Sequence, residues 1–283
     1  MRLSFKKQME KPIWLVIILN NSFLFSQAPN FKIYYQKKND TLTLLMDNQD
    51  SFPYSIEFFG QPKVENMRSI GEHFKNRYVI EENTSKLRLA QFVPLDIHKP
   101  SSFKKIPEFK LTPGNNWKDA DEDYIYDLPY AKGKMFAIVQ GYNGEYSHKN
   151  QNALDFEMPE GTEVLAAREG SVILLKQNSN TGCGNEACAK DANFVNILHS
   201  DGTMASYVHL QFNSLKVKKG DKVKKGQVIA LSGNTGWSTG PHLHFDCSVL
   251  NPKKYRSLKT LFRINDGNKA EYLIKGINYR RNY

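Results

Sequence analysis

The sequence of 283 residues predicts an all-β protein with a small N-terminal domain similar to a β-sandwich and a second strand-rich domain after it. Short runs rich in β-branched and aromatic residues recur along the chain, and turn-forming residues separate them. In the C-terminal half, apolar and polar residues alternate with a period of two, which indicates strands with one buried face. The length suffices for two domains with cores of their own.

The overall composition is that of a soluble globular protein, with 24% charged and 40% hydrophobic residues. The formal net charge of +10 and the pI near 9.3 suggest an anionic surface or polymer as partner. We expect no nucleic-acid partner, and the sequence leaves the oligomeric state open.

Residues 1–27 have the composition of a secretory signal peptide. Four bases precede a mostly apolar run of about a dozen residues, which is shorter than the ~20 residues of a membrane span. We expect cleavage near residues 26–28, which makes the mature protein secreted or periplasmic and lowers its net charge to +7, because the segment holds four bases and one acid. An uncleaved anchor is the alternative. No other apolar run is long enough, so we expect no stable membrane span after signal removal.

The N-terminal β domain, residues 28–118, consists of short β-rich runs at the spacing of a small sandwich. These runs are FKIYYQ, TLTLLM, YSIEFF, RYVI, KLRLAQFV and FKKIPEFKL. His73 and His98 lie among polar residues without ligand-type neighbours, so we expect them at the surface and assign this domain no chemistry. Residues 112–124, TPGNNWKDADEDY, combine Pro-Gly, Asn and acidic residues, as is typical of a linker.

The second domain, residues 119–250, opens with the first candidate site residues. A predicted strand, MFAIVQG, precedes a loop rich in Gly and Asn that carries His148. In the next strand, ALDF, Leu154 and Phe156 share one face, so Asp155 lies on the other. An acidic side chain opposite the core and close to a loop histidine is the first indication of a site.

A predicted hairpin carries the next candidate. Asp-Gly at 201–202, between NFVNILHS and TMASYVHL, is a strong signal for a type I′ turn. In the second run Tyr207 and His209 share the parity opposite the aliphatic residues, which predicts that both face the polar, site side of the strand. Tyr207 is then either a substrate contact or a packing residue. We expect His199, at the mouth of the hairpin, at the surface.

Residues 233–249, GNTGWSTGPHLHFDCSV, combine a Gly/Ser/Thr-rich loop with an alternating strand. His242 and His244 are two residues apart, so they project from one face about 7 Å apart and can converge on one ion or reacting group. Cys247 shares the parity of the apolar residues, which predicts a buried thiol opposite the histidines.

The other cysteines, Cys183 and Cys188, are expected to form a disulfide in an exported protein. A zinc finger is the alternative, but no second Cys/His pair follows at finger spacing. The Lys-rich residues 215–226 are expected to form a solvated face. Residues 251–283, with two strand-like runs, are expected to pack on the second domain as a C-terminal tail.

Five residues carry candidate chemistry, namely His148, Asp155, His209, His242 and His244. Zinc takes imidazole and carboxylate ligands together, and a catalytic site leaves one coordination position for water. Two imidazoles and one carboxylate leave a net positive metal, which lowers the pKa of bound water toward ~7. The two other histidines can then accept a proton and stabilise an oxyanion. The set predicts hydrolysis assisted by one Zn²⁺.

Three segments in this order, SHKNQNALDFEMPEGTEVLAAREGSVI, SYVHL and SGNTGWSTGPHLHF, resemble the M23 family of zinc metallopeptidases, the lysostaphin-like or LytM-type endopeptidases. The resemblance covers residues 141–249 and implies a compact domain on an antiparallel β-sheet, with the site in a groove across it. It also implies a zinc metalloendopeptidase that cleaves stem peptides or cross-bridges of bacterial peptidoglycan.

The resemblance further implies that His148, Asp155 and His244 hold the zinc and that His209 and His242 form the catalytic pair. Strand parity alone does not distinguish His242 from His244. In one departure, six residues separate His148 from Asp155, where the first motif of the family has three. A loop absorbs three extra residues at small entropic cost.

Two other functions fit the same segments. Some members of the family lack the metal and act as binding or regulatory modules, although no ligand is missing here. A peptidase of Gly-rich protein outside the cell wall would share the site and differ only in its groove.

Overall fold

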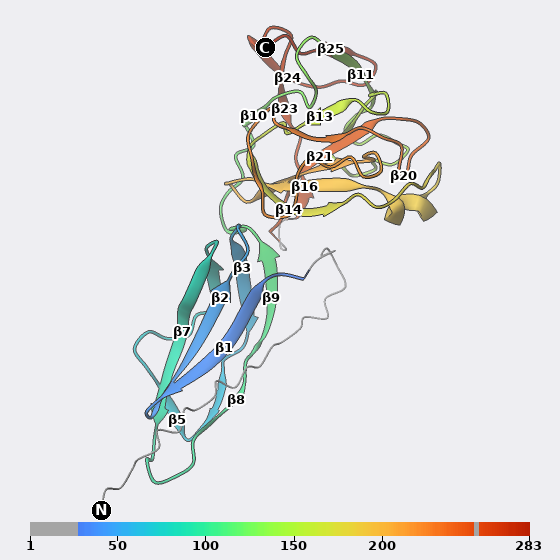
Figure 1. The fold of residues 1–283 in the computed structure, drawn as a ribbon. Coiled ribbons are helices and arrows are strands. Elements are labelled where there is room, and N and C mark those ends of the chain that lie inside the picture. Colours follow the sequence, from blue (N-terminus) through green and yellow to red (C-terminus); the bar gives the residue numbers. More distant parts are fainter. Residues whose placement is uncertain (1–27, 252–254) are drawn as a thin grey trace, which may run out of the picture. The chain divides into compact units, whose positions relative to one another are not determined.

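The structure is a computed structural model that describes residues 28–251 and 255–283. In these ranges the chain forms β-strands and one short 3₁₀ helix, Glu186–Asp191, and it divides into two compact units (Figure 1). One unit holds Asn30–Asp50 and Ile56–Leu111, and the other holds Ser51–Ser55 and Thr112–Tyr283. The predicted all-β class is confirmed. The predicted signal peptide lies outside the described residues.

The N-terminal unit is built from three sheets, with strand orders β1-β2-β7-β5, β6-β3-β9 and β4-β8. The strands are β1 Phe31–Lys38, β2 Thr41–Asn48, β3 Tyr54–Phe59, β4 Lys63–Glu65, β5 Met67–Ile70, β6 Arg77–Ile80, β7 Thr84–Pro94, β8 Ser102–Lys105 and β9 Glu108–Pro113. Two of them, β4 and β5, were not among the strands expected from the sequence.

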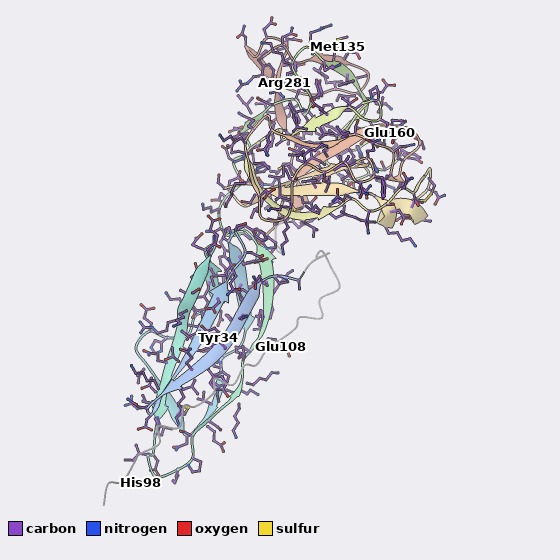
Figure 2. The ribbon with its side chains drawn as sticks, in the orientation of Figure 1. Tyr34, His98, Glu108, Met135, Glu160 and Arg281 are labelled. Atoms are coloured by element: carbon purple, nitrogen blue, oxygen red, sulfur yellow. A yellow bond between two sulfur atoms is a disulfide. The ribbon has the colours of Figure 1, made fainter. Side chains whose placement is uncertain are left out.

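Alternating apolar residues bury one face of these strands. In β2, Leu44 and Met46 are fully buried, and in β3 the ring of Phe58 lies 4.9 Å from that of Phe74, centroid to centroid. Such aromatic packing supplies much of the buried apolar area in a small sandwich. His73 and His98 are exposed, as the sequence predicts, and His98 is labelled in Figure 2.

The C-terminal unit is organised on a nine-stranded sheet in the order β18-β14-β16-β17-β21-β12-β11-β25, with β22 paired to β21. The strands of this unit are β10 Ile125–Tyr126, β11 Met135–Gln140, β12 Ala153–Phe156, β13 Glu163–Leu165, β14 Gly170–Lys176, β15 Gly182–Cys183, β16 Phe194–Leu198, β17 Thr203–Val208, β18 Lys222–Val223, β19 Val228–Leu231, β20 Gly236–Trp237, β21 Leu243–Val249, β22 Arg256–Ser257, β23 Leu261–Ile264, β24 Lys269–Tyr272 and β25 Asn278–Arg280.

The pairing of β12 with β21 separates the core from the site. Leu154 lies opposite Phe245 in the register, and both are fully buried in the main apolar cluster. Asp155 lies opposite His244, on the reverse face. Cys247 is fully buried, and its Sγ lies 3.2 Å from the hydroxyl of Tyr126. The predicted burial of Cys247 is confirmed, and so is the Cys183–Cys188 disulfide.

The hairpin turn between β16 and β17 differs from the expected type I′. A type I′ turn needs positive φ at both central residues, whereas only Gly202, at φ 82°, has it here. The amide of Gly202 donates to the carbonyl of His199, which is the pattern of a type I turn followed by a left-handed glycine. The prediction of a type I′ turn was therefore wrong, although the hairpin itself is present.

The C-terminal segment is more than a tail, because it contributes strands to the sheet. β22 pairs with β21, and β25 pairs with the edge of β11. Beyond β25, the buried guanidinium of Arg281 (labelled in Figure 2) donates to the carbonyls of Leu128 and Tyr130, and its Nη2 lies 3.3 Å from Asp127. The part of the chain that the structure describes contains no helix that could span a bilayer.

We predict that Arg281→Ala lowers the free energy of unfolding by about 3–5 kcal/mol. The buried carboxylate of Asp127 loses an ion-pair partner, and the carbonyls of Leu128 and Tyr130 lose their donor. Urea denaturation measures this loss. Arg280→Ala is the control, because Arg280 is exposed and the change should cost less than about 0.5 kcal/mol. Equal stability of the two variants would contradict the assigned role of Arg281.

Candidate metal centre

Three side chains converge on the polar face of the sheet. The Nε2 atom of His148 lies 3.2 Å from Oδ1 of Asp155 and 3.1 Å from Nδ1 of His244. The same Oδ1 lies 3.0 Å from Nδ1 of His244, so the three atoms form a small triangle. His148 and Asp155 are buried, and His244 is partly exposed.

Two of these residues are fixed by strand register and the third by a loop. Asp155 and His244 are direct partners across β12 and β21. The loop with His148 is held by main-chain bonds, from the amide of His148 to the carbonyl of Gly144 and from the amide of Gln151 to the carbonyl of His148. The long spacing between His148 and Asp155 is thus taken up by this turn, and it does not separate the two side chains.

Hydrogen bonding fixes which ring nitrogen of His148 carries the proton. Its Nδ1 lies 3.1 Å from the carbonyl oxygen of Gly141, which can only accept, so Nδ1 donates. In the neutral ring, Nε2 then presents a lone pair to the carboxylate of Asp155 and to Nδ1 of His244. Such a cluster of electron-rich atoms is stable only with a proton or a cation among them.

The donor set fits a small divalent metal ion. Imidazole nitrogens and a carboxylate oxygen are ligands for zinc at about 2.0–2.2 Å, and ligands at such distances around a tetrahedral ion lie about 3.3–3.5 Å apart. The observed separations of 3.0–3.2 Å are close to that spacing. The backbone carbonyl on Nδ1 of His148 is the outer contact that orients a ligating histidine.

Two further histidines face the same cluster. Nδ1 of His209 lies 2.7 Å from the carbonyl oxygen of Thr235, and Nδ1 of His242 lies 2.8 Å from that of Gly240. Because both carbonyls are acceptors, each ring donates from Nδ1 and carries its lone pair on Nε2. Nε2 of His242 lies 3.8 Å from Oδ1 of Asp155, and the rings of His209 and His242 are 4.5 Å apart, centroid to centroid.

His209 reaches the site by a backbone irregularity that the sequence pattern does not contain. Strand β17 ends at Val208, and His209 has a left-handed backbone with φ 64°. Tyr207 therefore faces the core: it is fully buried, and its ring lies 5.2 Å from that of Phe245. The prediction that Tyr207 and His209 share the site face was wrong for Tyr207, whose hydroxyl accepts from the amide of Ala167.

The charges of the cluster are strongly coupled. Burial opposes ionisation of Asp155, but when the imidazoles of His148 and His244 are protonated, their hydrogen bonds to the carboxylate outweigh burial and hold the pKa of this carboxyl well below its usual range. Burial would likewise lower the pKa of His244, yet its contacts with Asp155 and Asp246 raise it to about 10. For His209, burial and then the neighbouring rings of His242 and His244 lower the pKa to about 3.

Comparison with known proteins identifies this unit. Residues 149–255 match the family model "Peptidase family M23". The chain carries an M23 peptidase domain. The match includes Asp155, His209, His242 and His244, and it begins one residue after His148.

Curated relatives agree with this assignment. The peptidoglycan DD-endopeptidase ShyB of Vibrio cholerae is 30% identical over 203 residues, which cover 67% of this chain and 44% of ShyB. The glycyl-glycine endopeptidase ALE-1 of Staphylococcus capitis is 40% identical over 118 residues, which cover 41% of this chain and 28% of ALE-1. The chain thus spans less than half the length of these relatives.

Among solved structures, the catalytic domain of lysostaphin from Staphylococcus simulans is 30% identical to this chain. The alignment covers 44% of this chain and 87% of the lysostaphin domain, with a TM-score of 0.33.

Sequence reasoning missed the residues that hold the M23 cluster in place. Gln140 donates from Nε2 to Oδ2 of Asp155 at 2.9 Å and to the hydroxyl of Ser147 at 2.8 Å, so it links the carboxylate to the loop with His148. Strict alternation would place Gln140 on the core face with Ile138, but a β-bulge between them brings Gln140 opposite Asp155, on the site face.

A buried asparagine supports the loop that orients His209. Asn193 is fully buried; its Oδ1 accepts from the amide of Ser179, and its Nδ2 donates to the carbonyls of Ser179 and Leu210. The amide of Asn193 donates to the hydroxyl of Thr235, whose carbonyl holds His209. Asn193 therefore connects three chain segments beneath the site.

His199 and Asn143 are not part of the donor cluster. His199 is 3% exposed, and its Nδ1 donates to the carbonyl of Glu169, so the prediction of a surface position was wrong. Burial, with the nearby guanidinium of Arg168, lowers its pKa to about 4. Asn143 is exposed, and its left-handed backbone at φ 55° shapes the loop that carries His148.

We predict that Asn193→Ala lowers the free energy of unfolding by about 2–4 kcal/mol, because it leaves the buried amide and carbonyl of Ser179 without partners and removes one of the two donors to the carbonyl of Leu210. Chemical denaturation of the purified protein measures the loss. Asn178→Ala, an exposed asparagine of the same loop, is the control and should change stability by less than about 0.5 kcal/mol. A small effect at both positions would show that Asn193 does not support the site.

Proposed function

We propose that the chain is an exported, zinc-dependent endopeptidase that hydrolyses peptide cross-links or stem peptides of bacterial peptidoglycan. His148, Asp155 and His244 hold one Zn²⁺, and His209 and His242 act beside it. The observation that carries the proposal is the convergence of three donor atoms within 3.2 Å, with two more imidazoles held by carbonyls, in an M23 domain.

The chemistry of peptide hydrolysis follows from these side chains. When bound, a zinc ion supplies Lewis acidity, which polarises the scissile carbonyl and makes water a stronger acid. His209 and His242 present Nε2 lone pairs on the same side, so either ring can take the proton of the attacking water as a general base. Once protonated, that ring donates from Nε2 to the oxyanion or to the leaving amine. The carbonyls of Thr235 and Gly240 keep the rings in the productive tautomer throughout.

The substrate class comes from the relatives. ShyB and ShyA carry the name peptidoglycan DD-endopeptidase, whereas ALE-1 carries the name glycyl-glycine endopeptidase. We favour peptidoglycan over a Gly-rich protein because the net positive charge suits an anionic wall polymer. Export to the periplasm or the medium is part of the proposal and rests on the composition of residues 1–27.

Removal of the metal should abolish activity. We predict that the purified protein binds one zinc ion and releases muropeptides from sacculi, and that chelation stops this release until zinc is restored. His244→Ala should lose both the metal and at least about 1,000-fold in turnover, because one of three ligands is gone. His98→Ala, which removes an exposed histidine of the N-terminal unit, should retain both.

Metal content and product analysis separate the alternatives. A folded protein without stoichiometric zinc, or muropeptide release that persists in His244→Ala, contradicts the proposal and favours a non-catalytic wall-binding module. Cleavage of pentaglycine peptides but not of purified sacculi would assign the enzyme to Gly-rich substrates instead.

Gln140 should tune metal affinity without binding the metal. We predict that Gln140→Leu weakens zinc binding about 10- to 100-fold, because Oδ2 of Asp155 loses its donor and the loop with His148 loses its link. Competition with a chromophoric chelator measures the affinity. Gln61→Leu, in the N-terminal unit, serves as control and should leave the affinity unchanged. Unaltered affinity in Gln140→Leu would exclude this supporting role.

A further inference from the structure

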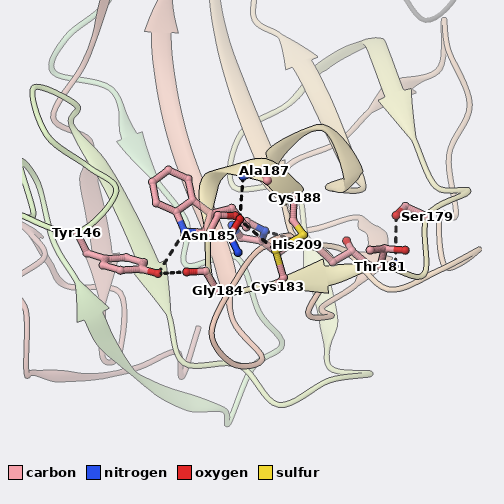
Figure 3. The surroundings of a disulfide bond; sticks show 11 residues. Tyr146, Ser179, Thr181, Cys183, Gly184, Asn185, Ala187, Cys188 and His209 are labelled. Atoms are coloured by element: carbon pink, nitrogen blue, oxygen red, sulfur yellow. Dashed lines mark hydrogen bonds between the residues drawn. A yellow bond between two sulfur atoms is a disulfide. The ribbon is translucent and has the colours of Figure 1, made fainter.

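The disulfide-closed loop at Cys183 and Cys188 pairs directly with the loop that precedes His242 (Figure 3). Strand β15 runs parallel to β20, with Gly182 opposite Gly236 and Cys183 opposite Trp237. Two further main-chain bonds extend this pairing, from the amide of Gly236 to the carbonyl of Thr181 at 2.8 Å and from the amide of Ser238 to the carbonyl of Cys183 at 3.0 Å.

These bonds lie between the two main-chain carbonyls that orient His209 and His242. Thr235, whose carbonyl holds Nδ1 of His209, immediately precedes Gly236. The hydroxyl of Ser238 lies 2.6 Å from Oδ1 of Asn234 and 2.8 Å from the carbonyl oxygen of Gly240, which accepts from Nδ1 of His242. The hydroxyl itself lies 3.2 Å from this Nδ1. The cystine loop therefore pairs with residues 236–238, which lie between Thr235 and Gly240, the residues whose carbonyls orient His209 and His242.

The approach of the two loops is close. A side chain at Gly182 would place its Cβ 2.1 Å from the carbonyl oxygen of Asn234, so the pairing accepts no larger residue there. On the outer side, the hydroxyl of Tyr146 donates to the carbonyl of Gly184 at 2.7 Å and accepts from Nε1 of Trp237 at 3.2 Å. The cystine loop is thus joined to the loop with His148 as well, as Figure 3 shows for Tyr146 and Gly184.

Little apolar packing holds the cystine loop in this place. The 3₁₀ helix Glu186–Asp191 within it has no buried residue, and most of the loop is exposed. A segment with few buried contacts opens locally at low cost, and a covalent crosslink restricts the open ensemble. By contrast, the three candidate ligands are held by β12, β21 and the loop with His148.

We propose that the Cys183–Cys188 disulfide is a positioning element for His209 and His242, so that its reduction lowers turnover while the metal stays bound. The part of this proposal that concerns turnover rests on the proposed function. The part that concerns the two imidazoles does not, because their tautomers are observable without any substrate.

The test uses the full mature chain loaded with zinc, as wild type and as Cys183→Ser/Cys188→Ser. Long-range ¹H–¹⁵N NMR of histidine-labelled protein reports the tautomer of each ring. In the wild type, His209 and His242 should appear as Nδ1–H tautomers. In the double variant, both should change to mixed tautomers, whereas His148, held by the carbonyl of Gly141, should keep its own.

Kinetics and a matched control complete the test. In the double variant, kcat on sacculi should fall about 10- to 100-fold, because displacement of a catalytic group by about 1 Å costs this much. Zinc content should remain one per chain. Ala187→Ser/Ala189→Ser places two new hydroxyls in the same loop and keeps the disulfide, so its tautomers and kcat should match the wild type.

Two results would overturn the proposal. The first is a folded double variant with unchanged tautomers at His209 and His242. The second is a double variant that loses zinc and the tautomer of His148 together with the others, since the disulfide would then support the whole domain. If the wild type cleaves neither sacculi nor pentaglycine, the proposed function fails, and the tautomer comparison still decides the positioning role.

Discussion

The antiparallel pairing of β12 with β21 is the constraint on which the site depends. It sets Asp155 opposite His244 on one face and Leu154 opposite Phe245 on the other, so the same hydrogen-bond ladder builds the core and the donor cluster. Since the side-chain period of a strand is two, a slip of one residue would turn the polar pair toward the core and the apolar pair toward solvent. The apolar face thus enforces the register that brings the electron-rich atoms within 3.0 Å.

Main-chain carbonyls orient the histidine rings of the site, in addition to the strand register that places the side chains. The oxygens of Gly141, Thr235 and Gly240 each accept from the Nδ1 of a histidine, and together they direct three Nε2 atoms toward the site. A carbonyl oxygen can only accept, so each contact fixes the Nδ1–H tautomer of the neutral ring. The loops that present these carbonyls therefore decide the chemistry of side chains that lie elsewhere in the sequence.

The sequence predicted the features that depend on strand alternation. The facing of Asp155 and His244 and the burial of Cys247 follow from a period of two and are observed. Alternation failed at Tyr207, because the strand ends at Val208 and the left-handed residue after it resets the pattern.

It also failed at Gln140, where a bulge intervenes. The surface position of His199, expected from its place at the mouth of the hairpin, was wrong because a carbonyl accepts from its ring in the interior. Every residue has a main-chain carbonyl, so contacts made by carbonyl oxygens cannot be inferred from the types of the side chains. Neither the orienting role of Thr235 nor the pairing of the cystine loop could be predicted from residue types. The choice of His244 over His242 as a proposed metal ligand came from family resemblance, since parity does not separate the two.

The left-handed backbone of His209 strains the fold, while the same conformation directs the imidazole toward the site. At φ 64° a glycine or an asparagine would be less strained than an imidazole-bearing residue, and within residues 28–251 and 255–283 asparagine occupies most of the other non-glycine positions of this kind. Selection for stability alone would thus replace this histidine. Position 209 is thus a site at which the stability of the fold and the proposed chemistry favour different residues.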